Sequence, residues 1–346
     1  MTDYILNQYI RYPQMEIEDI FKFIYQGAFG CEHMVTSLHN ATMRIEEESR
    51  LRTDKGCIEE LSDEYIRIPI SYVSDGLTPS TLGKLFYLSA KTEAHGQTKL
   101  EEGLKTASEL ILSGKLNFSY NEFTKKVDTW RKNGYNSLHH SSKFRSLYNP
   151  HYRVVSRRFL SALPLLIKID SLPKNEKSVI AIDGGSGSGK TTLAALICEI
   201  YGATVFHMDD FFLTPEMRTE KRLSEPGGNV DRERFESEVL LPLSCGMDVC
   251  YKVFDCSVGA FKMPTVAKPK NLTVIEGAYS MHPQLSAYYD FSVFLDISED
   301  RQRERILKRN PTALASRFFN EWIPLENIYF EKTNIRSRCD LIISIN

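Results

Sequence analysis

The sequence predicts two domains, a mostly α-helical domain over residues 1–165 and an α/β domain over residues 170–346 in which helices cover both faces of a parallel sheet. Three observations predict this organisation. Helical periodicity dominates the first 165 residues, strand-like and helical segments alternate after residue 178, and a glycine-rich loop stands between the first of those strands and the next helix. A length of 346 residues also exceeds that of most single domains.

The first domain is predicted from apolar residues at helical spacing, which we interpret as the core-packing faces of helices. These residues are Ile17, Ile20, Phe21 and Ile24; Leu82, Leu85, Phe86 and Ser89; Leu100, Leu104, Ala107 and Ile111; and Phe123, Val127 and Trp130. The segment DSLPKNEK (170–177) is polar, contains a proline and separates two differently patterned regions. We therefore interpret it as the linker.

The second domain is predicted from short apolar runs that alternate with helical segments. We expect strands at residues 178–183, 203–208, 271–276, 291–297 and 341–345, and helices at 192–201 and 231–241. Alternation of this kind indicates a parallel sheet with helices on both faces.

Composition and charge narrow the function classes. Hydrophobic residues make up 42% of the chain and charged residues 25%, as in ordinary globular proteins. The net charge of −2 provides no overall attraction to nucleic acid or anionic membranes, and no apolar run approaches the roughly 18 residues that a membrane span needs. The N-terminus lacks a secretory pattern, and the seven cysteines show no CxxC spacing. We expect a cytoplasmic protein without nucleic-acid or membrane partners, and homo-oligomerisation stays open.

A phosphate-binding loop is predicted where the first strand of the second domain ends. The segment GGSGSGKT (184–191) matches G-x-x-x-x-G-K-[ST]. Glycines let backbone N–H groups turn toward phosphate oxygens, and the following helix presents its positive end to them. Lys190 is expected to reach the β- and γ-phosphates, and Thr191 to ligate Mg²⁺. The expected nucleotide-binding residues are Gly184, Gly185, Ser186, Gly187, Ser188, Gly189, Lys190, Thr191 and Thr192.

Two carboxylates, Asp209 and Asp210, follow the second predicted strand. The carboxyl ends of parallel strands border the crevice in which ligands bind. A carboxylate there could take a proton from a hydroxyl that attacks the γ-phosphate. The alternatives are a solvated pair of loop residues or a helix N-cap. The chain has neither the NKxD motif that recognises guanine nor the LSGGQ signature of transporters. The class of P-loop protein must therefore be inferred from the residues that follow the loop.

Four ordered motifs resemble those of the uridine kinase family, in the phosphoribulokinase/uridine kinase group of P-loop kinases. They are IDGGSGSGKTTLA, MDDFF, GGNVDRERFESEVLLPL and VIEGAYS, and the likeness runs over about residues 178–346. The resemblance implies a P-loop nucleoside-kinase-like fold and a phosphotransferase that acts on an alcohol group. It further implies ATP and Mg²⁺ as cofactors and a small-molecule acceptor such as uridine or cytidine.

The resemblance also implies roles for particular residues. Asp209 aligns best with the catalytic base, with a one-residue offset to Asp210 left open. Asp231 corresponds to an aspartate that binds ribose hydroxyls, although a helix N-cap is the alternative. Glu276 stands where related kinases place a carboxylate near Mg²⁺. Arg305 and Arg309 resemble lid arginines, and the alternative for them is a solvated helix face. A further pattern, Trp322, Glu326 and Tyr329, is interpreted as mostly structural.

The sequence departs from the family where the nucleobase is recognised. Many uridine-cytidine kinases have Tyr-Asp there, followed by a base-contacting histidine. This chain has Phe254 and Asp255, and Gly259 stands about where the histidine would be. The acceptor therefore stays open among a nucleoside, nicotinamide riboside, pantothenate and a sugar acid. A nucleotide-sensing regulator with an effector-binding N-terminal domain, and a bifunctional enzyme, are the remaining hypotheses.

The N-terminal domain carries no motif that we can assign. Two segments are unusual, QGAFGCEH (26–33) and LHHSSKFRSLYNPHYRVV (138–155). Their Cys31, Glu32, His33, His139, His140 and His151 could converge on a metal or a small ligand. Scattered histidines are more often structural, and we hold that interpretation beside the functional one.

Overall fold

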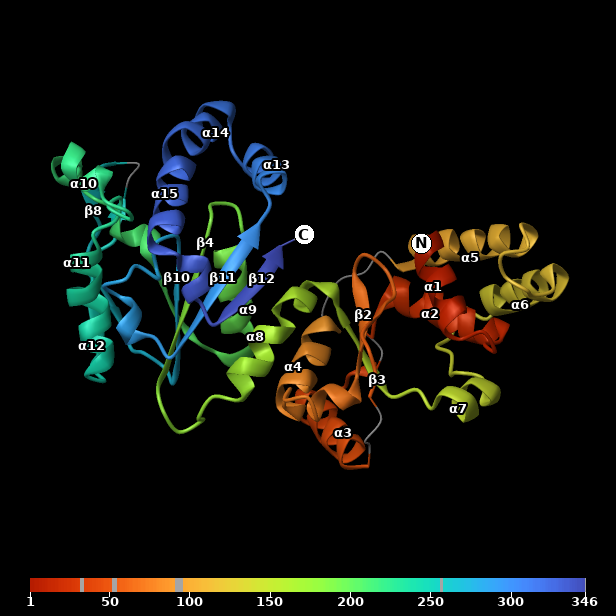
Figure 1. Ribbon diagram of the computed structural model, residues 1–346. Helices are drawn as coiled ribbons and strands as arrows, with labels where there is room; N and C mark the ends of the chain where they lie inside the picture. Colours follow the sequence, from red (N-terminus) through yellow and green to blue (C-terminus); the bar gives the residue numbers. More distant parts are fainter. Residues whose placement is uncertain (32–33, 52–54, 91–95, 256–257, 346) are drawn as a thin grey trace. The chain divides into compact units, whose positions relative to one another are not determined.

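The computed structural model describes residues 1–346 except 32–33, 52–54, 91–95, 256–257 and 346. The described chain divides into two compact units, Met1–Asp170 and Ser171–Asn346 (Figure 1). None of the helices in the described part is both long enough and apolar enough to cross a membrane. The six described cysteines are free thiols.

The first unit is mostly helical and also contains a small antiparallel sheet in the order β1-β2-β3. Its elements are α1 (Thr2–Arg11), α2 (Ile17–Phe29), α3 (Leu38–Arg50), β1 (Glu59–Glu60), β2 (Tyr65–Pro69), α4 (Pro79–Ser89), α5 (Gly96–Leu112), α6 (Tyr120–Lys132), α7 (Ser142–Tyr148), β3 (Tyr152–Ser156) and α8 (Leu163–Asp170). The four predicted apolar stripes lie on α2, α4, α5 and α6, and their members are buried.

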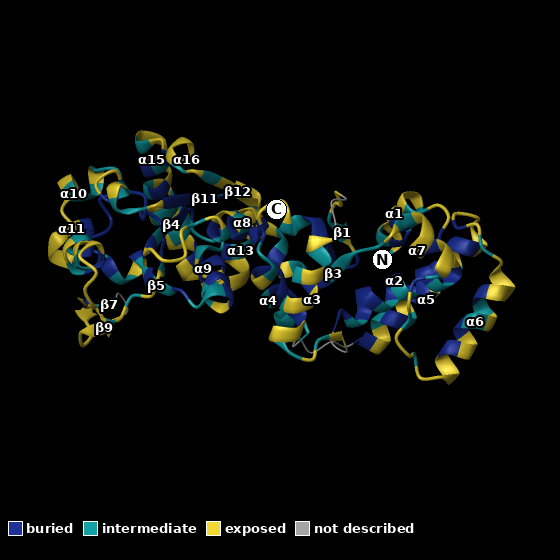
Figure 2. Cartoon of the chain, turned by 90° about the horizontal axis from the view of Figure 1, so that it is seen from below, coloured by how far each residue is buried: buried dark blue, intermediate teal, exposed yellow. Residues whose placement is uncertain are grey.

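The second unit is built on a five-stranded sheet in the order β12-β11-β4-β10-β5, with every pair parallel. Its strands are β4 (Ser178–Gly184), β5 (Thr204–His207), β10 (Leu272–Glu276), β11 (Phe291–Ile297) and β12 (Leu341–Ile345). Each corresponds to a predicted strand to within a residue or two. The predicted α/β fold class is thus confirmed, and Figure 2 shows the central strands as the buried part of the unit.

Helices cover both faces of this sheet because its central strands are apolar on both sides. On one face, Ala181, Phe206 and Ile275 pack with residues of the segment 232–244 and of the C-terminal helices. That segment joins α11 (Arg232–Phe235) to α12 (Leu241–Ser244) through a π-helical turn, and α15 (Ile323–Thr333) and α16 (Ile335–Arg338) follow later in the chain. On the other face lies α9 (Lys190–Tyr201), whose Ala194 and Ile197 are fully buried.

Further helices and strands complete the second unit. They are α10 (Glu220–Ser224), the strand pairs β6 (Val249–Tyr251) with β9 (Thr265–Ala267) and β7 (Phe254–Asp255) with β8 (Ala260–Phe261), and the helices α13 (Glu299–Arg309) and α14 (Thr312–Arg317). The two strand pairs were not predicted, because strands of two or three residues leave almost no periodicity to detect.

Candidate functional site

The glycine-rich loop connects β4 to α9, as its sequence predicts. Gly187 and Gly189 have φ values of +77° and +100°, a region that residues with a Cβ rarely adopt. Their N–H groups donate to no acceptor in the described part of the chain, and the first turn of α9 adds further unpaired donors. Lys190 Nζ bonds the carbonyl oxygens of Gly184 and Gly185 at 2.8 and 3.0 Å. The loop therefore presents the donor-lined cradle that phosphate groups require.

Three side chains from distant positions hold this loop in place. The Glu326 carboxylate, only 4% exposed, accepts hydrogen bonds from Ser186 N at 2.8 Å and from Ser186 Oγ at 2.6 Å. Gln302 Nε2 donates to Ser186 O at 2.8 Å. Arg305 Nη1 donates to the carbonyls of Gly187 and Ser188 at 3.2 and 3.3 Å. Burial raises the pKa of Glu326, and Lys190 and Ser186 oppose that shift.

A carboxylate and a hydroxyl meet at the carboxyl end of the sheet. Because β10 lies between β4 and β5, the last residue of β10, Glu276, pairs with Ile182 and with His207. Thr191 Oγ1 donates to Glu276 Oε1 at 3.0 Å, and His207 Nδ1 lies 2.5 Å from the same oxygen. A hydroxyl and a carboxylate oxygen form a hard-oxygen pair that suits Mg²⁺. The sequence analysis did not single out His207, and its place at the end of a strand was the available signal.

The two predicted candidates for the base have different surroundings. The side chain of Asp209 is accessible to solvent, but the surrounding protein excludes much of the water around its carboxylate, and this desolvation raises its pKa. The positive charges of Lys190, His207 and Arg309 act in the opposite direction and lower the pKa. Asp210 also has a raised pKa from desolvation, and its neighbouring cations are His207, Lys262 and Arg234. Asp209 thus lies within the field of the phosphate-loop lysine.

Two of the expected acceptor residues make local contacts within the second unit. Asp231 is buried and caps α11, because its side chain accepts a hydrogen bond from Arg234 N at 3.1 Å. Its predicted alternative, an N-cap, is therefore present in the structure. Asp255 forms an ion pair with Lys262 at 3.1 Å. Phe254 is 5% exposed and packs against the Phe261 ring with centroids 5.3 Å apart, so it offers no polar contact.

Tyr279 is a further candidate that the sequence analysis missed. It follows Glu276 by three residues and has φ +75°, which is uncommon for a residue with a side chain. The ring is 3% exposed, and its hydroxyl lies near Asn229 without forming a well-oriented hydrogen bond within the described chain. Strained backbone and an unpaired buried hydroxyl occur together at functional sites more often than elsewhere.

The candidate ligands of the N-terminal unit do not converge on one point among the described residues. His140 bonds Asp19 and Tyr152, at 3.0 and 2.7 Å, and Cys31 Sγ contacts Phe86 O at 3.6 Å. No group of three or more histidine, cysteine, aspartate or glutamate side chains that could hold a metal occurs in the part of the chain that the structure describes. Glu32 and His33 lie outside the described residues.

Comparisons with known proteins find relatives of the second unit. Residues 179–313 match the model of the phosphoribulokinase / uridine kinase family. A protein named uridine kinase from Staphylococcus epidermidis is 26% identical over an alignment of 190 residues, and the match covers 49% of this chain and 88% of the relative. A second protein named uridine kinase, from Chlamydia pneumoniae, is 28% identical over an alignment of 192 residues, and this match covers 49% of this chain and 82% of the relative.

Solved structures give likenesses of similar extent. A possible uridine kinase from Bacillus stearothermophilus has a TM-score of 0.41 and 22% identity, and the likeness covers 54% of this chain and 95% of that one. A putative fructose transport system kinase from a Silicibacter species also has a TM-score of 0.41 and 22% identity, with 53% and 98% covered. The match to the family model confirms the resemblance inferred from the motifs, and it does not include the first unit.

Proposed function

We propose, from the membership of residues 179–313 in the phosphoribulokinase / uridine kinase family, that the chain is an ATP- and Mg²⁺-dependent kinase. It transfers the γ-phosphoryl group of ATP to a hydroxyl of a small molecule. The observation that carries the proposal is the meeting of Lys190, Thr191, Glu276 and Asp209 at one edge of the parallel sheet. Phosphoryl transfer needs donors for the phosphates, oxygen ligands for a metal and a base for the acceptor, and these four residues provide them.

The phosphate loop supports the nucleotide part of the proposal. The N–H groups of Gly187 and Gly189 and the first turn of α9 would bind phosphate oxygens, and Lys190 would exchange its two carbonyl contacts for them. Thr191 and Glu276 would hold Mg²⁺, which neutralises phosphate charge when bound. His207 would orient Glu276 through their hydrogen bond.

Asp209 is the proposed base, because it is the carboxylate near both Lys190 and Arg309. Its raised pKa brings it closer to the value at which a carboxylate accepts a proton from a hydroxyl. Arg309 would neutralise charge on the transferred group. Arg305, expected in the lid beside it, holds the phosphate loop in this structure, and we propose that it keeps this loop-supporting role during turnover.

For the acceptor we propose a nucleoside of the uridine or cytidine type, bound through Asp210, Asp231 and Asp255. One observation favours a second candidate, a polyol or acid without a pyrimidine. Phe254 faces Phe261 instead of supplying a hydroxyl, and Gly259 lies in the turn of the same hairpin with φ +66°. Neither residue can donate a hydrogen bond from its side chain to a base.

The test is ATP consumption by the purified chain with Mg²⁺ and a panel of nucleosides, vitamins and sugar acids. Lys190→Ala should abolish turnover, and Asp209→Asn should reduce kcat by about 10²–10⁴-fold. Asp210→Asn separates the two candidates for the base: because Asp210 is proposed to bind the acceptor, near Lys262 and Arg234, this variant should raise the KM for the acceptor and reduce kcat less than Asp209→Asn does. Full turnover by Asp209→Asn would contradict the assignment of the base. An absence of turnover with every acceptor would favour a nucleotide-sensing regulator.

A further inference from the structure

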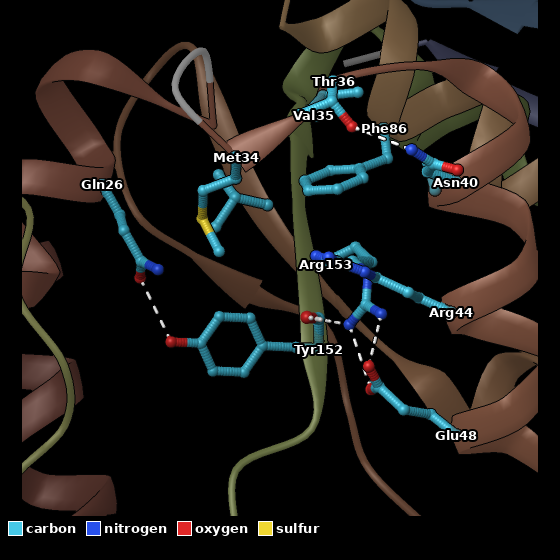
Figure 3. A pocket seen from close by; sticks show the side chains of 12 residues that line it. Gln26, Met34, Val35, Thr36, Asn40, Arg44, Glu48, Phe86, Tyr152 and Arg153 are labelled. Atoms are coloured by element: carbon cyan, nitrogen blue, oxygen red, sulfur yellow. Dashed lines mark hydrogen bonds and ion pairs between the residues drawn. The ribbon is translucent and has the colours of Figure 1, made fainter.

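The first unit contains a cavity of about 160 Å³ that no part of the proposed kinase reaction uses. Its walls come from α2, α3, α4 and β3 and from residues 34–36, which precede α3 (Figure 3). The residues that matter for the argument are Gln26, Arg44, Glu48, Phe86, Tyr152 and Arg153. Gln26 and Tyr152 belong to the two unusual segments of this domain, 26–33 and 138–155.

The orientation of the Gln26 side chain is fixed, and it places a hydrogen-bond donor at the cavity. Gln26 is 4% exposed, and its Oε1 accepts from Arg67 Nε at 3.0 Å, from Arg67 Nη2 at 2.6 Å and from Tyr152 OH at 3.3 Å. Because a guanidinium only donates hydrogen bonds, the amide oxygen must face Arg67. The amide nitrogen then faces the other way, toward the cavity (Figure 3), and no acceptor within the described chain receives its hydrogen bond.

The charges around the cavity leave one cation unpaired. Arg153 and Glu48 neutralise each other through two hydrogen bonds of 2.6 and 3.1 Å. Arg44 lines the same cavity one helical turn before Glu48 on α3, and none of the described residues forms an ion pair or a hydrogen bond with its side chain. The described lining therefore carries a net positive charge, with the solvent-exposed Arg44 guanidinium on one side and the Gln26 amide N–H on the other.

Two aromatic rings form the apolar part of the wall. Phe86 is 5% exposed, and Tyr152 is fixed by several partners. The Tyr152 hydroxyl lies 2.7 Å from His140 Nε2, and the Arg67 guanidinium lies 4.4 Å from the centroid of its ring. Side chains held in this way lose little conformational entropy when a ligand binds, which favours affinity.

We propose that this cavity binds a small metabolite that carries a carboxylate or a phosphate group beside a compact apolar or planar part. Arg44 and the Gln26 amide bind the anionic group, and Phe86 and Tyr152 contact the remainder. The volume lies below the roughly 300–1,000 Å³ of pockets for drug-sized ligands, so we expect a ligand smaller than a nucleotide. The site is independent of the phosphate-transfer chemistry proposed for the second unit.

The experiment uses the full-length chain with Lys190→Ala, so that the phosphate loop contributes little to anion binding. Benzoate and inorganic phosphate are the probes, and benzamide is the neutral isostere of benzoate. Binding is measured by ligand-observed NMR titration, with phosphate also tested as a competitor of benzoate. We expect saturable binding of benzoate, displacement by phosphate, and binding of benzamide that is at least about tenfold weaker.

Two substitutions test the residues that define the site. Arg44→Gln removes the unpaired cation, and Arg50→Gln is its control because Arg50 lies on the same helix and pairs with Glu46 outside the cavity. Gln26→Glu retains the acceptor for Arg67 and replaces the amide donor with a carboxylate oxygen. We expect Arg44→Gln and Gln26→Glu each to weaken benzoate binding at least about tenfold, and Arg50→Gln to leave it unchanged.

Circular dichroism melting curves establish that each variant is folded before it is compared. Equal affinity of all three variants would overturn the proposal, and so would equal binding of benzoate and benzamide or the absence of any anion binding. Because none of these measurements requires kinase activity, failure of this proposal is distinguishable from failure of the proposed reaction.

Discussion

Two serines of the phosphate loop should respond in opposite ways to the same substitution. Ser186 and Ser188 are two residues apart, and alanine removes one hydroxyl from each. The Ser186 hydroxyl donates to the buried Glu326 carboxylate at 2.6 Å. The Ser188 hydroxyl is buried, with Ser188 only 1% exposed, and it has no hydrogen-bond partner within the described chain.

The magnitudes follow from these environments. A hydrogen bond to a charged group contributes about 1.5–3 kcal/mol, so Ser186→Ala should lower the free energy of unfolding of the second unit by about 2 kcal/mol. Burial of a hydroxyl without a partner costs about 1–3 kcal/mol, so Ser188→Ala removes an unfavourable term. Its free energy of unfolding should stay within about 0.5 kcal/mol of the parent value or exceed it.

Urea denaturation followed by tryptophan fluorescence can measure this difference in the second unit alone. The chain has two tryptophans, Trp130 in the first unit and Trp322 in the second. In a Trp130→Phe background the fluorescence change reports Trp322, which packs edge-on against Phe318 at 4.5 Å. Both serine variants and their parent share that background, so its own effect cancels. If Ser186→Ala costs no more stability than Ser188→Ala, the inference that Glu326 holds the loop is refuted.

Three further predictions address the acceptor, the core and pH. Tyr279→Phe should raise the KM for the acceptor about tenfold and leave the KM for ATP unchanged, since its hydroxyl is a buried unpaired group; equal changes in both constants would contradict an acceptor contact. Phe206→Ala should cost about 3–5 kcal/mol in urea denaturation, because Phe206 is fully buried on β5; a loss below 1 kcal/mol would contradict tight packing there. Burial lowers the pKa of His140 to about 4 from its usual 6.5. The folded protein therefore keeps its full stability above pH 6.5, where His140 is neutral in both the folded and the unfolded chain, and loses stability as pH falls toward 4. The free energy of unfolding of the first unit should then fall by about 3 kcal/mol over that range. Urea denaturation at each pH, followed by Trp130 fluorescence in a Trp322→Phe background, measures this fall, and His140→Asn should make it smaller.

Much of the second unit was predictable, because its strands are apolar on both faces and therefore form continuous apolar runs. The runs at 178–183 and 291–297 correspond to β4 and β11, and the helix that follows the phosphate loop begins at Lys190. The order of the strands was not predicted, because a parallel sheet is assembled by crossovers whose direction local patterns do not encode. The structure places β4 at the centre, with β10 and β11 beside it.

The small sheet of the first unit was missed for a related reason. β2 (Tyr65–Pro69) contains an arginine, Arg67, in the middle of an apolar stretch, and a charged residue normally indicates an exposed face. In the structure Arg67 is 1% exposed, because Glu59 and Gln26 satisfy its donors and Tyr152 covers its guanidinium. Partners that lie 8, 41 and 85 residues away in sequence are invisible to a reading of local spacing.

In the candidate site, too, features that depend on neighbouring residues were predictable, and contacts between residues far apart in sequence were not. The loop 184–191 was predictable because its glycines, lysine and threonine belong to one continuous eight-residue motif. The contact of Glu326 with Ser186 joins residues 140 positions apart, and the pattern around Glu326 was interpreted as mostly structural. The structure refines that interpretation, since this structural role consists in holding the phosphate loop.

The identity of the acceptor is harder to predict than the phosphate loop, because the two parts of the site are built from different kinds of structure. The proposed metal-binding residues lie near the carboxyl ends of strands, and the register between β4, β10 and β5 fixes where Thr191, Glu276 and His207 meet. Several groups that we propose for the acceptor site instead come from the β7–β8 hairpin and from the loop that carries Tyr279, where conformation depends on packing and on a strained backbone. Substitutions such as Phe254 and Gly259 can therefore change the substrate while the transfer machinery is preserved. For this reason the acceptor panel must extend beyond nucleosides, even for a chain whose phosphate loop matches its motif without a gap.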